Sequence, residues 1–168
     1  MSKSEAAVSR WLFIVVALAL LTLDQFTKNL AIATLTLGID YPVLGDVLSW
    51  RLVYNDSAAF SLGFGQTWIL AVIAAVATLA TIWYSRKITS RSWAIMAGIF
   101  LAGVVGNLVD RLIREPSFGN GYVVDFIKIP FNFPVFNLAD IFIVSMAILT
   151  VIRVFRGEDL GGVAPKVK

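Results

Sequence analysis

The sequence predicts an all-α membrane protein in which four transmembrane helices carry a small extracytoplasmic region that contains β-strands. Two observations predict this fold class. Hydrophobic residues make up 58% of the 168 residues and charged residues only 15%, whereas soluble chains average about 25% charged residues. The apolar residues are also gathered into four long runs, each near the roughly 20 residues that cross a bilayer core. We therefore expect residues 1–168 to form a single integral membrane domain.

The four apolar runs define the expected membrane spans. Trp and Tyr stand at several of their ends, as expected for interfacial anchors. The first run could instead be a cleaved signal peptide, because Arg10 precedes an apolar stretch, but no small-residue cleavage site precedes Asp24. Three further runs would attach the chain to the membrane in either case. The expected spans are about 11–37, 68–84, 93–112 and 136–155.

Lysine and arginine are distributed by membrane side. They are frequent before the first span, between the second and third spans and at the C-terminus, and sparse in the two longer connections, about 38–66 and 113–135. The positive-inside rule then places both termini in the cytoplasm and both longer loops outside. The net charge of +3 is a topological signal and gives no indication of nucleic-acid binding. The basic residues on the expected cytoplasmic side are Lys3, Arg10, Arg86, Lys87, Arg91, Arg153, Arg156, Lys166 and Lys168.

The two outer loops contain segments typical of strands. Residues 47–54 are rich in β-formers, and an extended run over 122–129 follows a turn at 119–121. Asp125 lies within the second run, between Val124 and Phe126. Alternation in a strand would place Asp125 on one face with Val123 and Ile127.

Cysteine and histidine are both absent. Their absence excludes disulfides, thiol nucleophiles, Ser-His catalysis and metal sites built from His or Cys. An enzyme with this composition must use carboxylates as acid and base, with Lys or Tyr as weaker candidates. We expect no metal and no cofactor.

Polar residues from several segments converge at one depth. A first span that starts at residue 11 places Asp24 roughly 20 Å across the bilayer, with Lys28 one turn beyond it. The third span brings Asn107 and Asp110 to the same outer level. The fourth span descends from outside, so Asn137 and Asp140 lie in its first turn, close to the loop that carries Asp125. Two carboxylates in apolar sequence near a membrane surface, Asp125 and Asp140, are candidates for a functional site.

Each polar residue also has a simpler structural interpretation. Asp24 and Lys28 have the i, i+4 spacing of a helical ion pair. Asn107 and Asp110, with Arg111 and Arg114, could join helix ends. Asn137 could cap a helix with Asp140 at its third position, and residues 55–57 could form an ordinary turn. Asp125 has no comparable capping role. The coincidence of all of them at one depth favours a functional cleft.

Five motifs, in this order, resemble those of bacterial lipoprotein signal peptidase, also called signal peptidase II. The resemblance covers nearly the whole chain from residue 11 to 155. It implies an inner-membrane aspartic endopeptidase that removes signal peptides from diacylglyceryl-modified prolipoproteins, cutting before the lipid-modified Cys. The motifs are 24–28 (DQFTK), 55–60 (NDSAAF), 106–111 (GNLVDR), 123–126 (VVDF) and 136–140 (FNLAD).

The resemblance also assigns roles to residues. It implies that Asp125 and Asp140 are the catalytic pair, that Asn55, Asn107, Arg111 and Asn137 line the site and contact substrate or hold the pair, and that Asp24, Lys28 and Asp110 form a supporting polar shell. Two positions depart from the family pattern. The family commonly has Gly where Ser57 and Ala102 stand, which affects loop shape and substrate preference and leaves the pair intact.

The chemistry follows from the pairing of two carboxylates. Two close carboxyl groups cannot both ionise cheaply, so they share one proton near the working pH. One Asp then takes a proton from water, while the other, protonated, polarises the scissile carbonyl and later passes its proton toward the leaving amine. The expected partners are a diacylglyceryl-modified prolipoprotein and membrane lipid, with Phe60, Phe126, Phe131, Phe133 and Phe136 around the acyl chains.

Two other function classes remain open from the residues alone. A small ion- or proton-coupled carrier would also place acids within the membrane, although we find no internal repeat or Gly/Pro-broken span. A noncatalytic membrane assembly factor would explain the four spans and the helix-end polar pairs, but would give Asp125 and Asp140 no role.

Overall fold

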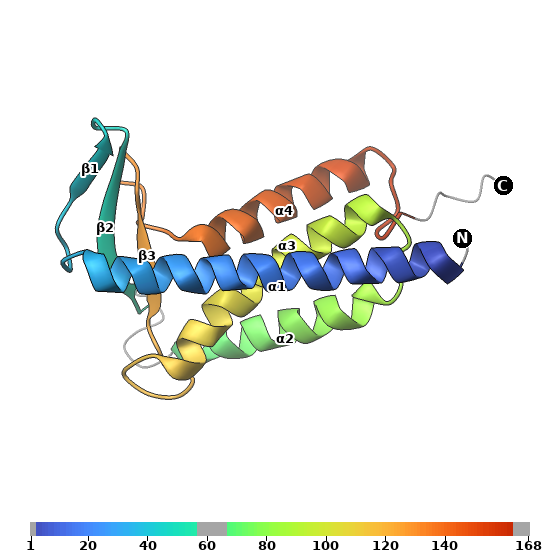
Figure 1. The fold of residues 1–168 in the computed structure, drawn as a ribbon, viewed down its shortest axis with the longest axis horizontal. Coiled ribbons are helices and arrows are strands. Elements are labelled where there is room, and N and C mark those ends of the chain that lie inside the picture. The colour runs from blue at the N-terminus through green and yellow to red at the C-terminus, as the bar shows by residue number, and fades with distance from the viewer. Residues whose placement is uncertain (1–2, 57–66, 163–168) are drawn as a thin grey trace.

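The computed structural model describes residues 3–56 and 67–162, and it consists of a bundle of long helices with a small sheet at one end (Figure 1). The helices are α1 (Lys3–Thr34), α2 (Thr67–Ser85), α3 (Arg91–Ile113) and α4 (Leu138–Phe155), and the strands are β1 (Tyr41–Leu44), β2 (Leu48–Asn55) and β3 (Val123–Lys128). In the described part of the chain, four helices are long and apolar enough to cross a membrane. The predicted fold class is confirmed.

Helix α3 forms the centre of the bundle. Half of the residues in its apolar, membrane-spanning stretch are buried, whereas 22% are buried in α1 and 11% in each of α2 and α4. Helices α1, α2 and α4 all pack against α3. Close approach depends on glycine. A Cβ atom at Gly103 would lie 2.6 Å from the carbonyl oxygen of Ala139, and one at Gly106 would lie 2.4 Å from Asp24 Oδ2. Ala102 is almost completely buried beside them, so the alanine at this departure from the family pattern fits within the packed face.

The outer faces of the helices are apolar. Large hydrophobic side chains along α1, α2 and α4 are exposed, among them Leu18, Val76 and Val144. A soluble protein rarely exposes apolar surface on this scale. These faces are suited to contact with lipid chains.

The sheet lies across one end of the bundle, and both described ends of the chain lie at the other (Figure 1). Its order is β1-β2-β3 with antiparallel pairing throughout. Val53 pairs with Asp125, and the register shifts between Trp50 and Val53. A core of buried residues joins the sheet to the end of α1: Ala31, Leu52, Val124, Phe126 and Ile127.

Three details differ from the sequence expectations. Strand β1 includes Pro42, a residue that argues against a strand unless it lies at an edge; here β1 is the edge strand. Strand β3 is buried from Val123 to Ile127, so its burial does not alternate. Helix α4 begins at Leu138, two residues later than the expected span, because Phe136 still exchanges backbone hydrogen bonds with Ile127.

Candidate active site

Asp125 is held within β3 by two asparagine side chains. Asn55 Nδ2 donates to Asp125 Oδ2 at 2.8 Å, and Asn137 Nδ2 donates to Asp125 Oδ1 at 2.6 Å. The residue is 1% exposed. Burial first, and then the charge of Asp140, raise the pKa of Asp125 to about 7, although the two asparagine hydrogen bonds act in the opposite direction. Asp125 can therefore hold a proton near neutral pH.

Asp140 lies in the first turn of α4 and is half-buried. Its Oδ2 accepts the backbone N–H of Asn137 at 3.0 Å, while Asn137 Oδ1 accepts the backbone N–H of Asp140 at 3.1 Å. This is a capping box at the start of the helix. The other carboxylate oxygen of Asp140, Oδ1, accepts a hydrogen bond from Asn107 Nδ2 at 2.8 Å. The capping interpretation of Asp140 is thus confirmed for Oδ2, while Oδ1 is bonded to another of the predicted site residues, and the catalytic role of Asp140 stays a prediction.

Asn107 and Asn137 connect the two carboxylates. Asn137 Nδ2 donates to Asn107 Oδ1 at 3.2 Å as well as to Asp125. Since Asn107 Oδ1 is occupied as an acceptor, its amide nitrogen must face Asp140. The chain of hydrogen bonds runs from Asp125 through both asparagines to Asp140. It therefore holds the carboxyl group on β3 and the carboxyl group on α4 in fixed positions.

Lys28 lies beneath this pair with no solvent exposure. Its Nζ contacts Asp24 Oδ2 at 3.0 Å and Asp110 Oδ2 at 2.9 Å, and it donates to Asn107 Oδ1 at 2.9 Å. A buried ammonium group is costly unless all its donors are used. Three acceptors satisfy its three donors, and the third of them orients Asn107 toward Asp140.

Asp24 and Asp110 each hold the backbone directly before one residue of the pair. Asp24 Oδ1 accepts the N–H of Ala139 at 3.1 Å, which precedes Asp140. Asp110 Oδ2 accepts the N–H of Val124 at 3.2 Å, which precedes Asp125. The cluster of Asp24, Lys28 and Asp110 therefore joins α1, α3, β3 and α4 at the site.

Two members of this network were not among the predicted site residues. Gln25 Nε2 lies 3.1 Å from Asp24 Oδ2 and 3.2 Å from Asp110 Oδ1, and Arg114 Nε contacts Asp110 Oδ1 at 2.7 Å. Both could have been found, since Gln25 adjoins Asp24 and Arg114 is four residues after Asp110. With Arg114 included, two cations balance the two acids of the network.

Arg111 is buried on α3 between these groups. Its Nη1 donates to the carbonyl oxygen of Asn107 at 3.3 Å, and the charges of Asp140, Asp110 and Asp125 act on it. The structure thus brings together all nine sequence-predicted site residues: Asp24, Lys28, Asn55, Asn107, Asp110, Arg111, Asp125, Asn137 and Asp140.

The phenylalanines expected around the acyl chains do not surround the site together. Phe126 belongs to the core beneath the sheet and packs at 6.0 Å from Trp50, because β3 is buried on both faces. Phe131 is 98% exposed, and Phe133 packs edge-on against Phe136 at 5.7 Å. Ser57 and Phe60 lie outside the described residues. Within 3–56 and 67–162, no group of three or more acidic side chains is arranged to hold a metal ion.

This geometry suits proton transfer to and from water. Asp125 is buried and can carry a proton near pH 7, while Asp140 is partly exposed and keeps one oxygen toward the helix cap. Two carboxyl groups in different environments can act as acid and base in one reaction.

Comparison with known proteins identifies the family. The family model for signal peptidase (SPase) II matches residues 16–156. The chain is 43% identical over 162 residues to a lipoprotein signal peptidase of Leifsonia xyli subsp. xyli, covering 96% of this chain and 75% of that one. It is 41% identical over 157 residues to a lipoprotein signal peptidase of Mycobacterium avium, covering 94% and 86%.

The fold also matches a solved structure described as a bacterial membrane enzyme. The TM-score is 0.75 with 26% sequence identity, and the match covers 86% of this chain and 92% of that one.

Proposed function

The chain belongs to the signal peptidase II family, and on this premise we propose that it is an aspartic endopeptidase that removes signal peptides from diacylglyceryl-modified prolipoproteins, cutting before the modified Cys. The observation that carries the proposal is the linked pair of Asp125 and Asp140, joined through Asn107 and Asn137. Membership of a peptidase family favours this activity over a carrier or an assembly factor.

In the proposed reaction the pair shares one proton. Asp125 holds it, because burial raises the pKa of Asp125 to about 7. Asp140 is ionised and takes a proton from water, whose oxygen attacks the scissile carbonyl carbon. Asp125 gives its proton to the carbonyl oxygen, and a tetrahedral diol forms.

Collapse of the diol completes the reaction. The C–N bond breaks as the amine nitrogen receives a proton from Asp140, and Asp125 recovers a proton from the diol. The products are the carboxyl end of the signal peptide and the free amine of the modified Cys. The step needs water and the two carboxyl groups, and the proposal includes no metal and no cofactor.

The polar residues around the pair have positioning roles in this proposal. Asn55, Asn107 and Asn137 hold the carboxyl oxygens, and Arg111 supplies positive charge close to the developing negative charge. Asp24, Lys28 and Asp110 fix the backbone before each catalytic residue. Substrate binding by the asparagines and Arg111 is part of the same proposal.

The chain is a multi-pass bacterial membrane protein, and we place it in the inner membrane with both termini in the cytoplasm. The α2–α3 connection and the end of α4 lie at the end of the bundle opposite the sheet (Figure 1), and both segments are rich in Lys and Arg, which supports this orientation. The pair of aspartates then lies near the outer face. Membrane lipid surrounds the helices, and no nucleic acid takes part.

Cleavage of two matched precursors tests the proposal. Purified protein is incubated in the same bilayer with a prolipoprotein that carries the diacylglyceryl group and with the same precursor lacking it. We expect the modified precursor to be cut before its Cys and the unmodified one very poorly, because the acyl chains hold the scissile bond at the depth of the pair. The Asp140→Asn protein is the control. Equal kcat/KM for both precursors would contradict lipid-dependent specificity, and cleavage by the control would contradict the aspartate pair.

A further inference from the structure

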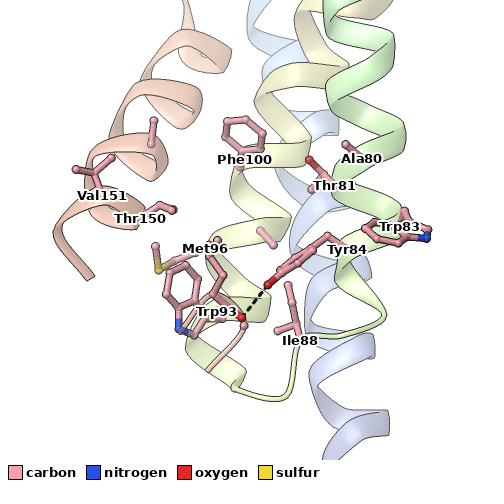
Figure 2. A pocket seen from close by; sticks show the side chains of 14 residues that line it. Ala80, Thr81, Trp83, Tyr84, Ile88, Trp93, Met96, Phe100, Thr150 and Val151 are labelled. Atoms are coloured by element: carbon pink, nitrogen blue, oxygen red, sulfur yellow. Dashed lines mark hydrogen bonds between the residues drawn. The ribbon is translucent and has the colours of Figure 1, made fainter. Parts of the chain in front are cut away.

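An apolar cavity of about 580 Å³ lies at the end of the bundle opposite the sheet, between α2, α3 and α4 (Figure 2). Its walls include the aromatic side chains of Trp83 and Tyr84 on α2 and of Trp93 and Phe100 on α3. The proposed peptidase reaction does not use this cavity. Its volume is that of a typical site for a small apolar ligand.

The C-terminal segment forms part of the cavity wall at this end of the bundle. Tyr84 Oη donates to the carbonyl oxygen of Leu160 at 2.9 Å (Figure 2), and the backbone N–H groups of Thr89 and Ser90 both donate to the carbonyl oxygen of Gly161. On the sides, the lining includes Ala80 of α2 and Ala147 of α4, which are exposed. The C-terminal segment therefore covers one end of the cavity, and the cavity opens sideways at α2 and α4, on the outer faces that are suited to lipid chains.

Cations stand beside the aromatic lining. Lys87 Nζ lies 4.2 Å from the centroid of the Trp83 ring, with the exposed Arg86 next to it in the chain. Arg153 lies 4.5 Å from the centroid of the Trp93 ring and is paired with Glu158. Within the described residues Lys87 forms no ion pair, so its charge is available to an anion close to the Trp83 and Tyr84 walls of the cavity.

We propose that this cavity binds an acyl chain of an anionic phospholipid, with the lipid phosphate held by Lys87 and Arg86. A lateral opening admits a chain that is already within the bilayer, and the two cations select a headgroup with net negative charge. A zwitterionic lipid could fill the cavity equally well, but would gain less from the cations.

The signal helix of a substrate fits this cavity less well. The N-terminal region of a signal peptide is positively charged, so Lys87 and Arg86 would repel it. A spanning helix of about 20 residues and 10 Å diameter also fills roughly 2,400 Å³, about four times the volume of the cavity. Charge and volume thus both favour the lipid.

Binding can be measured without catalysis, so the test is separate from that of the proposed function. The full chain carrying Asp140→Asn is purified in a neutral detergent and titrated with dioleoylphosphatidylglycerol or dioleoylphosphatidylcholine. Thermal stability and the number of lipids retained in native mass spectrometry are the readouts. We expect tighter binding and a larger rise in Tm with phosphatidylglycerol.

Three variants and two controls locate the site. Lys87→Gln should weaken phosphatidylglycerol binding about fivefold, and Lys87→Gln with Arg86→Gln roughly 25-fold. Ala147→Phe fills the cavity from α4 and should abolish retention of the lipid. The controls are Lys128→Gln, a cation at the sheet end, and Leu149→Phe, an exposed position of α4 outside the lining; both should bind as the parent does.

Three results would overturn the proposal. One is equal binding of the two lipids, and another is undiminished binding by the Lys87 and Ala147 variants when their far-UV circular dichroism matches the parent. The third is release of the bound phosphatidylglycerol by a soluble basic signal peptide that lacks acyl chains, which would assign the cavity to the substrate instead.

Discussion

At the sheet end of the bundle, Asp24, Lys28 and Asp110 have no exposed surface and are bonded to one another and to backbone N–H groups. At the opposite end, Arg86 and Lys87 are exposed, and Lys87 lies over Trp83, which lines an apolar cavity. The buried charges are costly to separate and hold several elements in place. The exposed charges hold no element together and can bind a ligand from outside. The location of a charge thus decides whether it organises the fold or recognises a partner.

Removal of either aspartate of the pair should have the largest effect. Asp125→Asn and Asp140→Asn should each reduce kcat by about 10³-fold or more, because the amide cannot exchange the proton. Cleavage of a diacylglyceryl-modified precursor is the measurement, with Tm as a check on folding. Asp159→Asn, at the opposite end, is the matched control and should cleave normally. Turnover near the parent rate in either variant of the pair would show that these acids matter no more for cleavage than Asp159 at the opposite end.

Neutralising Lys28 tests whether the buried network organises the site. Lys28→Met leaves Asp24 and Asp110 as buried charges without their shared cation, so we expect a loss of about 3–5 kcal/mol in the free energy of unfolding. We also expect a lower kcat in the molecules that remain folded, because Asn107 loses the contact that orients it toward Asp140.

The matched control for this variant is Lys128→Met. Lys128 pairs with the exposed Asp40 at the sheet, and exposed ion pairs contribute little. The control should keep its Tm and its kcat. Similar losses in both lysine variants would show that burial does not distinguish these charges.

The pH dependence should separate Asp125 from the exposed acids. Its pKa is raised from 3.8 to about 7, so the folded protein binds more protons than the unfolded chain between these values. Stability therefore falls as pH rises from about 4 to about 7, and kcat should fall above about pH 7 as the shared proton is lost.

Asp125→Asn is the control for the stability measurement. Its Tm should lose most of the dependence on pH between 4 and 7, whereas Asp40→Asn should retain it, because the pKa of Asp40 is lowered by its hydrogen bond to Lys128. An unchanged slope in Asp125→Asn would assign the dependence to another group.

Single cysteine replacements at exposed positions should have the smallest effect on function. Labelling these cysteines tests which end of the bundle faces the cytoplasm. The chain has no Cys, so single replacements at Asp46, Phe118 and Arg91 give unambiguous sites. In intact cells a membrane-impermeant thiol reagent should label the first two, at the sheet end, and should label the third only after the membrane is opened. The reverse pattern would place the aspartate pair on the cytoplasmic side.

The sequence predicted the main elements because their signals are local. Length and apolar composition predicted all four spans, and the i, i+4 spacing of Asp24 and Lys28 predicted their ion pair. The capping box of Asn137 and Asp140 was also local. Strand β1 was missed because Pro42 opposes a strand in general and is tolerated at this edge.

Contacts between distant segments could not be predicted in the same way. The bonds from Asp24 to Ala139 and from Asp110 to Val124 depend on how closely α1 and α4 approach α3. That approach depends in turn on Gly103 and Gly106, whose role becomes clear only when their neighbours are known. Phe126 was assigned to lipid contact for a similar reason, since alternation in a strand does not reveal that both of its faces are covered.

The charged residues of the buried network also bear on how the chain enters the membrane during synthesis. Helix α1 emerges from the ribosome long before α3, and it carries Asp24 and Lys28 as an internal pair at 3.0 Å. Helix α3 brings Asp110 and Arg114 as a second internal pair at 2.7 Å. Each acid of the network therefore reaches the bilayer with a cation one turn away in its own segment, which reduces the cost of inserting these acids before a partner helix is present. The bond between Lys28 and Asp110 can then form when the two helices meet, and until then each of the two acids, Asp24 and Asp110, has a cation beside it.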